Sequence, residues 1–232
     1  MTYFIARNEE NEEFAVSYLQ LPNRHKDLSS RIDYQLGEHQ ASFSMTEGHG
    51  SRIVGNYAAD FVLAHFSEDL FDENFDFDRQ TVELADDVNA QLYAMLREQS
   101  FDSQGCCSLT SMQIKDGRLS WLGVGACQSY LYRNEQLYVI TTGCRDENDQ
   151  PSYFGQEELN CLEKNDGWLL VKQHDRIIFL TSEAARLLDQ NAILEIITQP
   201  GTNRSWLVKL MEKAVSDQEE VNDFSLAIME IR

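Results

Sequence analysis

Hydrophobic and polar residues alternate in the middle of the chain with the two-residue period that is typical of β-strands. This pattern predicts strands at residues 105–114, 118–125, 128–133 and 136–141. Lys115-Asp116-Gly117 and Arg133-Asn134-Glu135 separate two of the strand pairs and are suited to hairpin turns. We therefore expect an antiparallel meander with one covered face in this part of the chain.

Before the meander, residues 52–66 and 81–97 carry apolar side chains at helical spacing. The acidic stretch between them, residues 67–78, is expected to be an ordered connection with a solvated face. Residues 41–46 are predicted to form a short strand, and the apolar residues within positions 1–30 indicate an added pair of strands.

After the meander, residues 143–157 are polar and are expected to form a loop. The elements predicted beyond it are strands at 168–173 and 176–182, helices at 184–198 and 203–216, and a strand at 223–231. Such segregated strands and helices favour an α+β layered domain over a doubly wound one. With neither a linker nor an internal repeat in the sequence, we expect residues 1–232 to be a single domain, with 1–30 as an N-terminal extension.

The charge balance changes what the chain is expected to bind. There are 39 acidic and 19 basic residues, which give a formal net charge of −20. Phosphates repel such an acidic protein, so we expect no nucleic-acid partner and no anionic membrane. A protein partner with a basic face fits the charge better. No apolar run is long enough to span a membrane, and the five cysteines have no framework spacing, so we expect reduced thiols and a cytoplasmic location.

Four short segments carry a family resemblance: residues 43–51, 121–133, 175–185 and 221–229. In this order they resemble the Asp-Gly-His/Met-Gly-Gly turn, the Val-Gly-Asp-Ser-Arg segment, the Ser-Asp-Gly strand end and the terminal Asp-Asn-Ile-Thr strand of the PPM family. These are the metal-dependent, type 2C protein serine/threonine phosphatases, here of the short bacterial type. The resemblance extends from about Arg31 to the C-terminus. It implies a four-layer α/β/β/α sandwich, in which helices flank two antiparallel sheets.

The family resemblance also implies a centre of two Mg²⁺ or Mn²⁺ ions, which requires a cluster of carboxylates. The bridging aspartate of the first turn falls on Glu47, followed by Gly48. The other ligand positions have mostly lost their charge: the remaining aspartates of the family fall on Ala126, Ser182 and Asn222, and of an early Glu-Asp pair only Asp33 remains. The chain therefore resembles a degenerate member of the family, a pseudophosphatase.

Two acids lie one residue beyond the lost positions, Glu183 after Ser182 and Asp223 after Asn222. A shift of one residue in the alignment would make them compensating ligands. Side chains alternate between the two faces of a strand, so such a shift normally directs the side chain away from the site. His49 occupies an acid/base position of the family, and Arg31 or Arg24 is the candidate for its phosphate-binding arginine; a solvated turn histidine and solvated arginines are the simpler interpretations.

The family resemblance and the missing carboxylates lead to two hypotheses. In the first, the chain is a catalytically impaired pseudophosphatase that binds metal weakly or not at all. It would then act as a binding or regulatory module in phosphorylation signalling, with a phosphoprotein, a kinase or another regulator as its partner. In the second, the chain is an active Mg²⁺- or Mn²⁺-dependent phosphatase with a rearranged site that uses Asp33, Glu47, Glu183 and Asp223. The missing carboxylates favour the first hypothesis.

Overall fold

The structure is a computed structural model, and it describes residues 5–22, 28–70, 72, 74–98, 105–145, 150–165, 169–216 and 221–232. The strands within these residues are β1 (Ile5–Glu10), β2 (Phe14–Leu21), β3 (Ser30–Leu36), β4 (Gln40–His49), β5 (Cys106–Lys115), β6 (Arg118–Val124), β7 (Gln128–Arg133), β8 (Gln136–Thr141), β9 (Glu163–Lys164), β10 (Leu169–Leu170), β11 (Arg176–Leu180) and β12 (Phe224–Ile231). The helices are α1 (Arg52–Leu70), α2 (Phe77–Glu98), α3 (Ser182–Leu187), α4 (Gln190–Ile197) and α5 (Asn203–Ser216).

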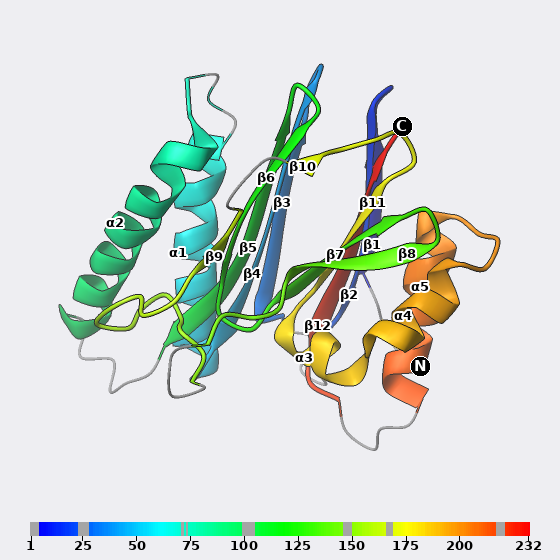
Figure 1. Cartoon of the computed structure of the whole chain (residues 1–232). Coiled ribbons are helices and arrows are strands. Elements are labelled where there is room, and N and C mark those ends of the chain that lie inside the picture. Colours follow the sequence, from blue (N-terminus) through cyan, green and yellow to red (C-terminus); the bar gives the residue numbers. More distant parts are fainter. Residues whose placement is uncertain are drawn as a thin grey trace.

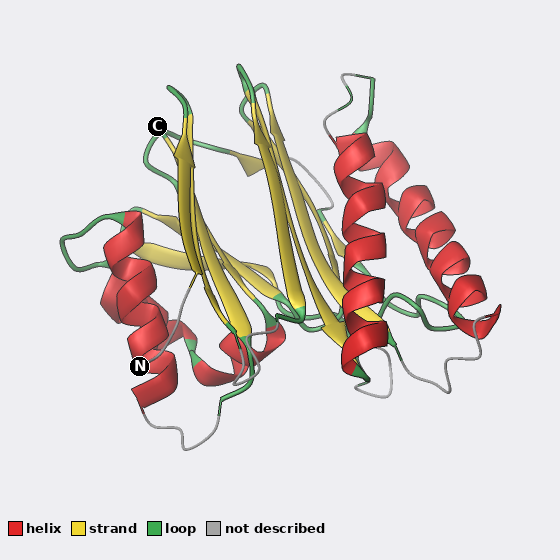
Figure 2. Ribbon diagram, turned by 180° about the vertical axis from the view of Figure 1, so that it is seen from behind, coloured by secondary structure: helices red, strands yellow, loops and turns green. Residues whose placement is uncertain are grey.

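The strands form two antiparallel sheets that face each other, as Figures 1 and 2 show. One sheet has the order β1-β2-β12-β11-β7-β8, and the other has the order β10-β6-β5-β4-β3, with β9 also paired to β6. Helices α1 and α2 cover the outer face of the second sheet, and α3, α4 and α5 cover the outer face of the first (Figure 1). The expected α+β sandwich with helices outside two antiparallel sheets is therefore confirmed.

Three apolar clusters hold these four layers together. One lies between α1, α2 and their sheet, and one lies between α3, α4, α5 and the other sheet. The third fills the space between the two sheets, where the rings of Phe43 on β4 and Phe179 on β11 lie 4.0 Å apart. Apolar burial on this scale is the main force that stabilises the fold. It also fixes where the strand ends lie, and those ends carry the candidate site.

The strand meander agrees with the prediction to within one residue at each end. Elsewhere the boundaries differ. The expected helix 184–198 is two helices, because the Asp189 side chain accepts a hydrogen bond from the Ala192 N–H (2.8 Å) and begins α4 there. The acidic connection is shorter than expected, since α1 continues to Leu70 and α2 begins at Phe77. The strand expected at 168–173 is confined to β10, and Trp168 lies outside the described residues.

Strands β1 and β2 agree with the strand pair that was expected near the N-terminus. Strand β2 is an interior strand, because it pairs with β1 on one side and with β12 on the other. All eight of its residues are buried. Strand β3, which sequence analysis did not predict, forms the outer edge of the other sheet and pairs with β4 so that Ser30 lies opposite Glu47.

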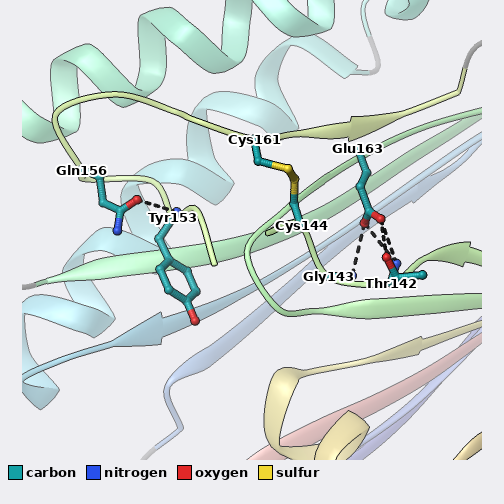
Figure 3. The surroundings of a disulfide bond; sticks show 7 residues. All are labelled: Thr142, Gly143, Cys144, Tyr153, Gln156, Cys161 and Glu163. Atoms are coloured by element: carbon teal, nitrogen blue, oxygen red, sulfur yellow. Dashed lines mark hydrogen bonds between the residues drawn. A yellow bond between two sulfur atoms is a disulfide. The ribbon is translucent and has the colours of Figure 1, made fainter. Parts of the chain in front are cut away.

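The cysteine prediction requires a correction, because the structure joins Cys144 to Cys161 in a disulfide bond with a Cα–Cα distance of 5.8 Å (Figure 3). The two residues are 17 positions apart and belong to no recognisable spacing motif, so the sequence did not indicate the bond. Cys106, Cys107 and Cys127 are free thiols. None of the helices in the described residues is both long and apolar enough to cross a membrane.

Candidate functional site

A polar cavity of about 390 Å³ opens where the ends of the two sheets meet. It is lined by the end of β4, the start of α1, the start of α3 and the segment that leads into β12. Its lining residues are Leu28, Ser29, Glu47, Gly48, His49, Gly50, Ser51, Arg52, Gly55, Asn56, Ser182, Glu183, Asn222 and Asp223. Three of the segments that carry the family resemblance thus meet in one cavity.

Gly48 allows helix α1 to lie close against the end of β4. A Cβ atom at Gly48 would lie 2.1 Å from the carbonyl oxygen of Gly55, which is far inside van der Waals contact. Gly50 then turns the chain into the helix with a φ of 93°, a conformation that favours glycine. The glycines of this turn therefore have a structural reason: they position the side chains of Glu47 and His49 at the mouth of the cavity.

Glu47 is a buried carboxylate whose partners are neutral. It is only 4% exposed and accepts hydrogen bonds from the Ser182 N–H (2.8 Å) and from the Ser182 hydroxyl. Burial raises the pKa of Glu47 from 4.5 to about 7, because water no longer stabilises the charged form. Among the described residues, no lysine or arginine forms an ion pair with it; the nearest basic group is His49, whose Nε2 lies 3.9 Å away.

His49 is held as a neutral imidazole. Its Nε2 shares a hydrogen bond of 2.8 Å with the Ser108 hydroxyl, and its ring lies 4.8 Å from that of Tyr153. Burial lowers the pKa of His49 from 6.5 to about 4. The histidine is therefore no solvated turn residue, since it is packed between β5 and the loop that carries Tyr153.

Both of the acids considered as compensating ligands line the cavity, and both already have partners. Asp223 accepts hydrogen bonds from the N–H (2.5 Å) and the hydroxyl (2.7 Å) of Ser29. Glu183 forms two hydrogen bonds with Arg186, at 2.8 and 2.9 Å. This arginine lowers the pKa of Glu183. Asn222 also lines the cavity, and its amide lies at hydrogen-bond distance (3.5 Å) from Glu183.

Ala126 lies beside the cavity rather than in it. It lines a neighbouring cavity of about 230 Å³, which shares Ser182 with the first. The Ala126 N–H donates a hydrogen bond to the Ser108 hydroxyl (3.2 Å), which is also the partner of His49. The structure therefore places the segment 121–133 of the resemblance next to the other three segments.

The structure does not bring Asp33 and Arg31 to the cavity. Ser30, not Asp33, lies opposite Glu47, and Asp33 pairs with Ser44 further along β3. The Arg31 guanidinium pairs instead with Asp60 of α1 (2.6 Å). The pattern along the chain does not specify the register of β3, and the structure places Asp33 and Arg31 outside the residues that line the cavity. Arg24 lies outside the described residues.

Sequence reasoning missed the serines and the tyrosine that complete the site. Ser29 bonds Asp223, Ser108 bonds His49, and Tyr153 packs on His49. Ser29 is adjacent to the residue that pairs with Glu47, and Ser108 itself lies opposite Glu47 on β5. The signal that would have found the two serines is the pairing of β3 and β5 with β4, which requires the strand register.

The acids that line the cavity have hydrogen-bond partners within the protein. Among the described residues, no group of three or more His, Cys, Asp or Glu side chains is arranged to hold a metal ion. Magnesium and manganese require several carboxylate or other oxygen ligands. Here Glu47 is bonded to Ser182, Asp223 to Ser29 and Glu183 to Arg186. The acids that remain are used within the protein.

Comparison with solved structures shows which proteins share this fold. A serine/threonine phosphatase from S. agalactiae superimposes with a TM-score of 0.80 at 15% identity, covering 94% of this chain and all of that one. The catalytic domain of the phosphatase PstP, solved with two manganese ions, has a TM-score of 0.72 at 15% identity over 99% of this chain and 97% of its own. RsbX, solved with magnesium, has a TM-score of 0.71 at 11% identity over 98% of this chain and all of its own.

No protein-family description matches the sequence, and a search of curated proteins found no match. Identities of 11–15% establish the architecture and nothing finer. These neighbours are PPM-family phosphatases, and they match the chain over nearly its whole length. The chain has the fold of the PPM serine/threonine phosphatases.

Proposed function

We propose that this chain is a pseudophosphatase: a protein with the phosphatase fold that does not hold the paired metal centre and acts as a binding module in phosphorylation signalling. The observation that carries the proposal is the bond between Glu47 and Ser182. By the sequence resemblance, Glu47 falls on the position of the bridging metal ligand and Ser182 on that of a second carboxylate. In this chain the Glu47 side chain is hydrogen-bonded to the Ser182 side chain. By the resemblance, the family has two carboxylates at these positions, and both face the metal ions.

Electrostatics supports the proposal. Two divalent cations about 4 Å apart repel each other strongly unless several anionic ligands surround them. In this cavity the Glu47 carboxylate accepts hydrogen bonds from the Ser182 N–H and hydroxyl. Of the two other acids, Glu183 is neutralised by Arg186. Too little negative charge remains to offset the repulsion between two ions.

The alternative is an active phosphatase with a rearranged metal site. It is supported by the presence of Glu47, Glu183 and Asp223 around one cavity. It requires that Glu183 leave Arg186, that Asp223 leave Ser29 and that Glu47 release Ser182. Asp33, the fourth acid of this hypothesis, lies further along β3 and would need a shift in strand register. Each of these changes costs interactions that the protein already makes, so we favour the pseudophosphatase.

Calorimetric titration with Mn²⁺ tests the proposal, and a triple variant supplies the positive control. The wild-type chain is expected to show no tight two-site binding and no metal-dependent hydrolysis of a phosphoserine peptide. The variant Glu47→Asp, Ser182→Asp, Asn222→Asp restores carboxylates at three ligand positions and is expected to gain Mn²⁺ binding. Tight two-site binding by the wild type, lost in Glu47→Ala, would refute the proposal and establish the alternative.

We propose further that the binding partner is a protein with a basic surface, because the chain carries a formal net charge of −20. A phosphoprotein, a kinase or another regulator fits this role. An attraction between opposite charges weakens as salt screens it, since the Debye length falls from about 10 Å at 0.1 M to about 3 Å at 1 M. Affinity for a partner recovered by crosslinking in cells should therefore fall steeply with added salt. Binding that is insensitive to salt would contradict the charge argument.

A further inference from the structure

A disulfide bond fastens two segments together beside the candidate site. Cys144 follows β8, at the edge of one sheet, and Cys161 precedes β9, at the edge of the other (Figure 3). Figure 3 also shows Glu163 meeting Thr142 and Gly143 next to the bond. The Glu163 carboxylate accepts hydrogen bonds from the N–H (3.1 Å) and hydroxyl (2.6 Å) of Thr142 and from the N–H of Gly143 (3.2 Å). A covalent bond and a carboxylate thus join the same two segments.

The joined segments touch the residues of the site directly. The Cys144 N–H donates to the carbonyl of Gly125 (2.7 Å), the residue before Ala126. Gly143 lies against Ala126, because a Cβ atom there would be 3.2 Å from the Ala126 Cα. Cys144 lines the smaller cavity together with Ala126 and Ser182. The position of the segment 142–144 therefore sets one wall of that cavity.

The loop that the disulfide closes also contacts His49, which lines the larger cavity. Tyr153 lies within this loop, and its ring lies 4.8 Å from that of His49. The next residue, Phe154, is fully buried and pairs with Cys107 of β5 through two backbone hydrogen bonds (3.0 and 3.1 Å). Apolar burial thus anchors the middle of the loop, and the disulfide anchors its two ends. Loss of the disulfide would free the ends while the middle stays attached.

We propose that the Cys144–Cys161 disulfide is a redox-sensitive clasp that holds the wall of the candidate site, and that its reduction loosens residues 142–145 and 161–165. The exchange needs an external dithiol. A thiolate of the dithiol attacks the Cys161 sulfur, because Cys161 is partly exposed and Cys144 is buried. The S–S bond breaks and the Cys144 sulfur leaves and takes up a proton. The second thiol of the reagent then releases Cys161, so the dithiol loses two electrons and two protons as the protein gains them.

The remaining cysteines are poor competitors for this exchange. Burial raises the pKa of Cys106 to about 11 and raises those of Cys107 and Cys127 well above the usual value. Thiolates are the reactive species, so these three stay inert near neutral pH. Re-formation of the bond from two thiols is a two-electron oxidation, and it needs an external oxidant such as glutathione disulfide.

Amide hydrogen exchange with mass detection tests the clasp on the whole chain. Addition of dithiothreitol is expected to speed exchange of the amides in 142–145 and 161–165, because a closed loop of this length makes opening less frequent by on the order of a hundredfold. Exchange in α5, which packs on β2 and β12 away from the bond, should not change. The double variant Cys144→Ser, Cys161→Ser should exchange rapidly with or without dithiothreitol. The matched variant Cys106→Ser keeps the disulfide and should respond as the wild type does.

Alkylation of the unfolded protein supplies the second measurement. Without reductant, three thiols are expected to be labelled, and with reductant all five. Five labels without reductant would overturn the proposal, because the bond would then not form. Three labels with no change in exchange on reduction would also overturn it, because the bond would then hold nothing in place. Neither result bears on Mn²⁺ binding, so these experiments test the clasp independently of the proposed function.

Discussion

Two buried carboxylates lie in different parts of the molecule and have different partners. Asp175, just before β11, is 2% exposed and pairs with the Arg133 guanidinium at 2.5 and 2.8 Å. Glu47, in the candidate site, is 4% exposed and is bonded by Ser182, with no lysine or arginine pairing with it among the described residues. The fold neutralises the first acid with a fixed cation. The second acid stands in a cavity and is stabilised by neutral donors and by protonation.

The two acids differ in how the protein meets the cost of burying them. A buried acid in a protein is normally paired or bound to metal, because an isolated charge in a poorly solvated place is costly. Glu47 meets that cost without a cation: Ser182 donates to it, and its pKa rises to about 7. This arrangement is what the pseudophosphatase proposal requires.

Removing the Arg133 side chain should have the largest effect on the free energy of unfolding, because it leaves Asp175 buried without its cation. Loss of one partner of a buried ion pair costs about 3–5 kcal/mol. We expect Arg133→Ala to lower the free energy of unfolding in urea by about 3 kcal/mol. The matched control is Arg79→Ala, whose side chain is 86% exposed and pairs with Asp76 on the surface. That change should cost less than about 0.5 kcal/mol, and equal losses in the two variants would break the comparison.

Glu47 should make stability depend on pH in a direction opposite to that of an ordinary paired acid. Its folded pKa is raised, so between pH 4.5 and about 7 the native state binds more protons than the unfolded state, and stability falls as pH rises through this range. A rise from 4.5 to about 7 corresponds to about 3 kcal/mol. Glu47→Gln should remove this contribution to the pH profile. Urea unfolding at a series of pH values measures it, and an unchanged profile would contradict the account of Glu47.

His49 should make the free energy of unfolding depend on pH in the opposite direction. Its folded pKa is lowered, so between pH 6.5 and about 4 the unfolded state binds the extra proton, and stability falls as pH falls. In the wild type the slopes of Glu47 and His49 should largely cancel between pH 4.5 and 6.5. Glu47→Gln should expose the His49 slope, and His49→Gln should expose the Glu47 slope. Slopes of the same sign in the two variants would show that one of the two burial arguments is wrong.

Removing the ion pair between Arg186 and Glu183 should have the smallest effect on the free energy of unfolding. Arg186→Gln removes an ion pair in which the arginine side chain is 56% exposed, and such pairs are worth about 0.5 kcal/mol or less. The pKa of Glu183, which Arg186 lowers, should return toward its ordinary value. An NMR titration of the Glu183 carboxyl measures this change directly. A pKa that does not move would mean that Arg186 does not hold this acid.

Much of the fold was predictable because periodicity and motif order report on local structure. The meander from Cys106 to Thr141 and the meeting of Glu47, Ser182 and Asn222 in one cavity follow from patterns along the chain. Such patterns do not specify which strands pair with each other or in which register. The edge strand β3 was therefore missed, and with it the register that places Ser30 rather than Asp33 opposite Glu47.

The details of the site were harder to predict for the same reason. The bond from Ser182 to Glu47 joins residues 135 positions apart, and the bond from Ser29 to Asp223 joins residues 194 apart. Only packing brings such pairs together. The Cys144–Cys161 disulfide likewise depends on how the ends of a loop return to the same place. The sequence analysis predicted reduced cysteines, because composition does not show which parts of the chain lie side by side in the fold.

The central claim is that the remaining side chains of the cavity do not hold two divalent cations. Crystals of the wild-type chain soaked in Mn²⁺ test this most directly, because the anomalous signal of manganese locates each bound ion. The account predicts no pair of manganese peaks in the cavity and an intact bond between Glu47 and Ser182. Two peaks about 4 Å apart, with Glu183 and Asp223 turned inward as ligands, would contradict it.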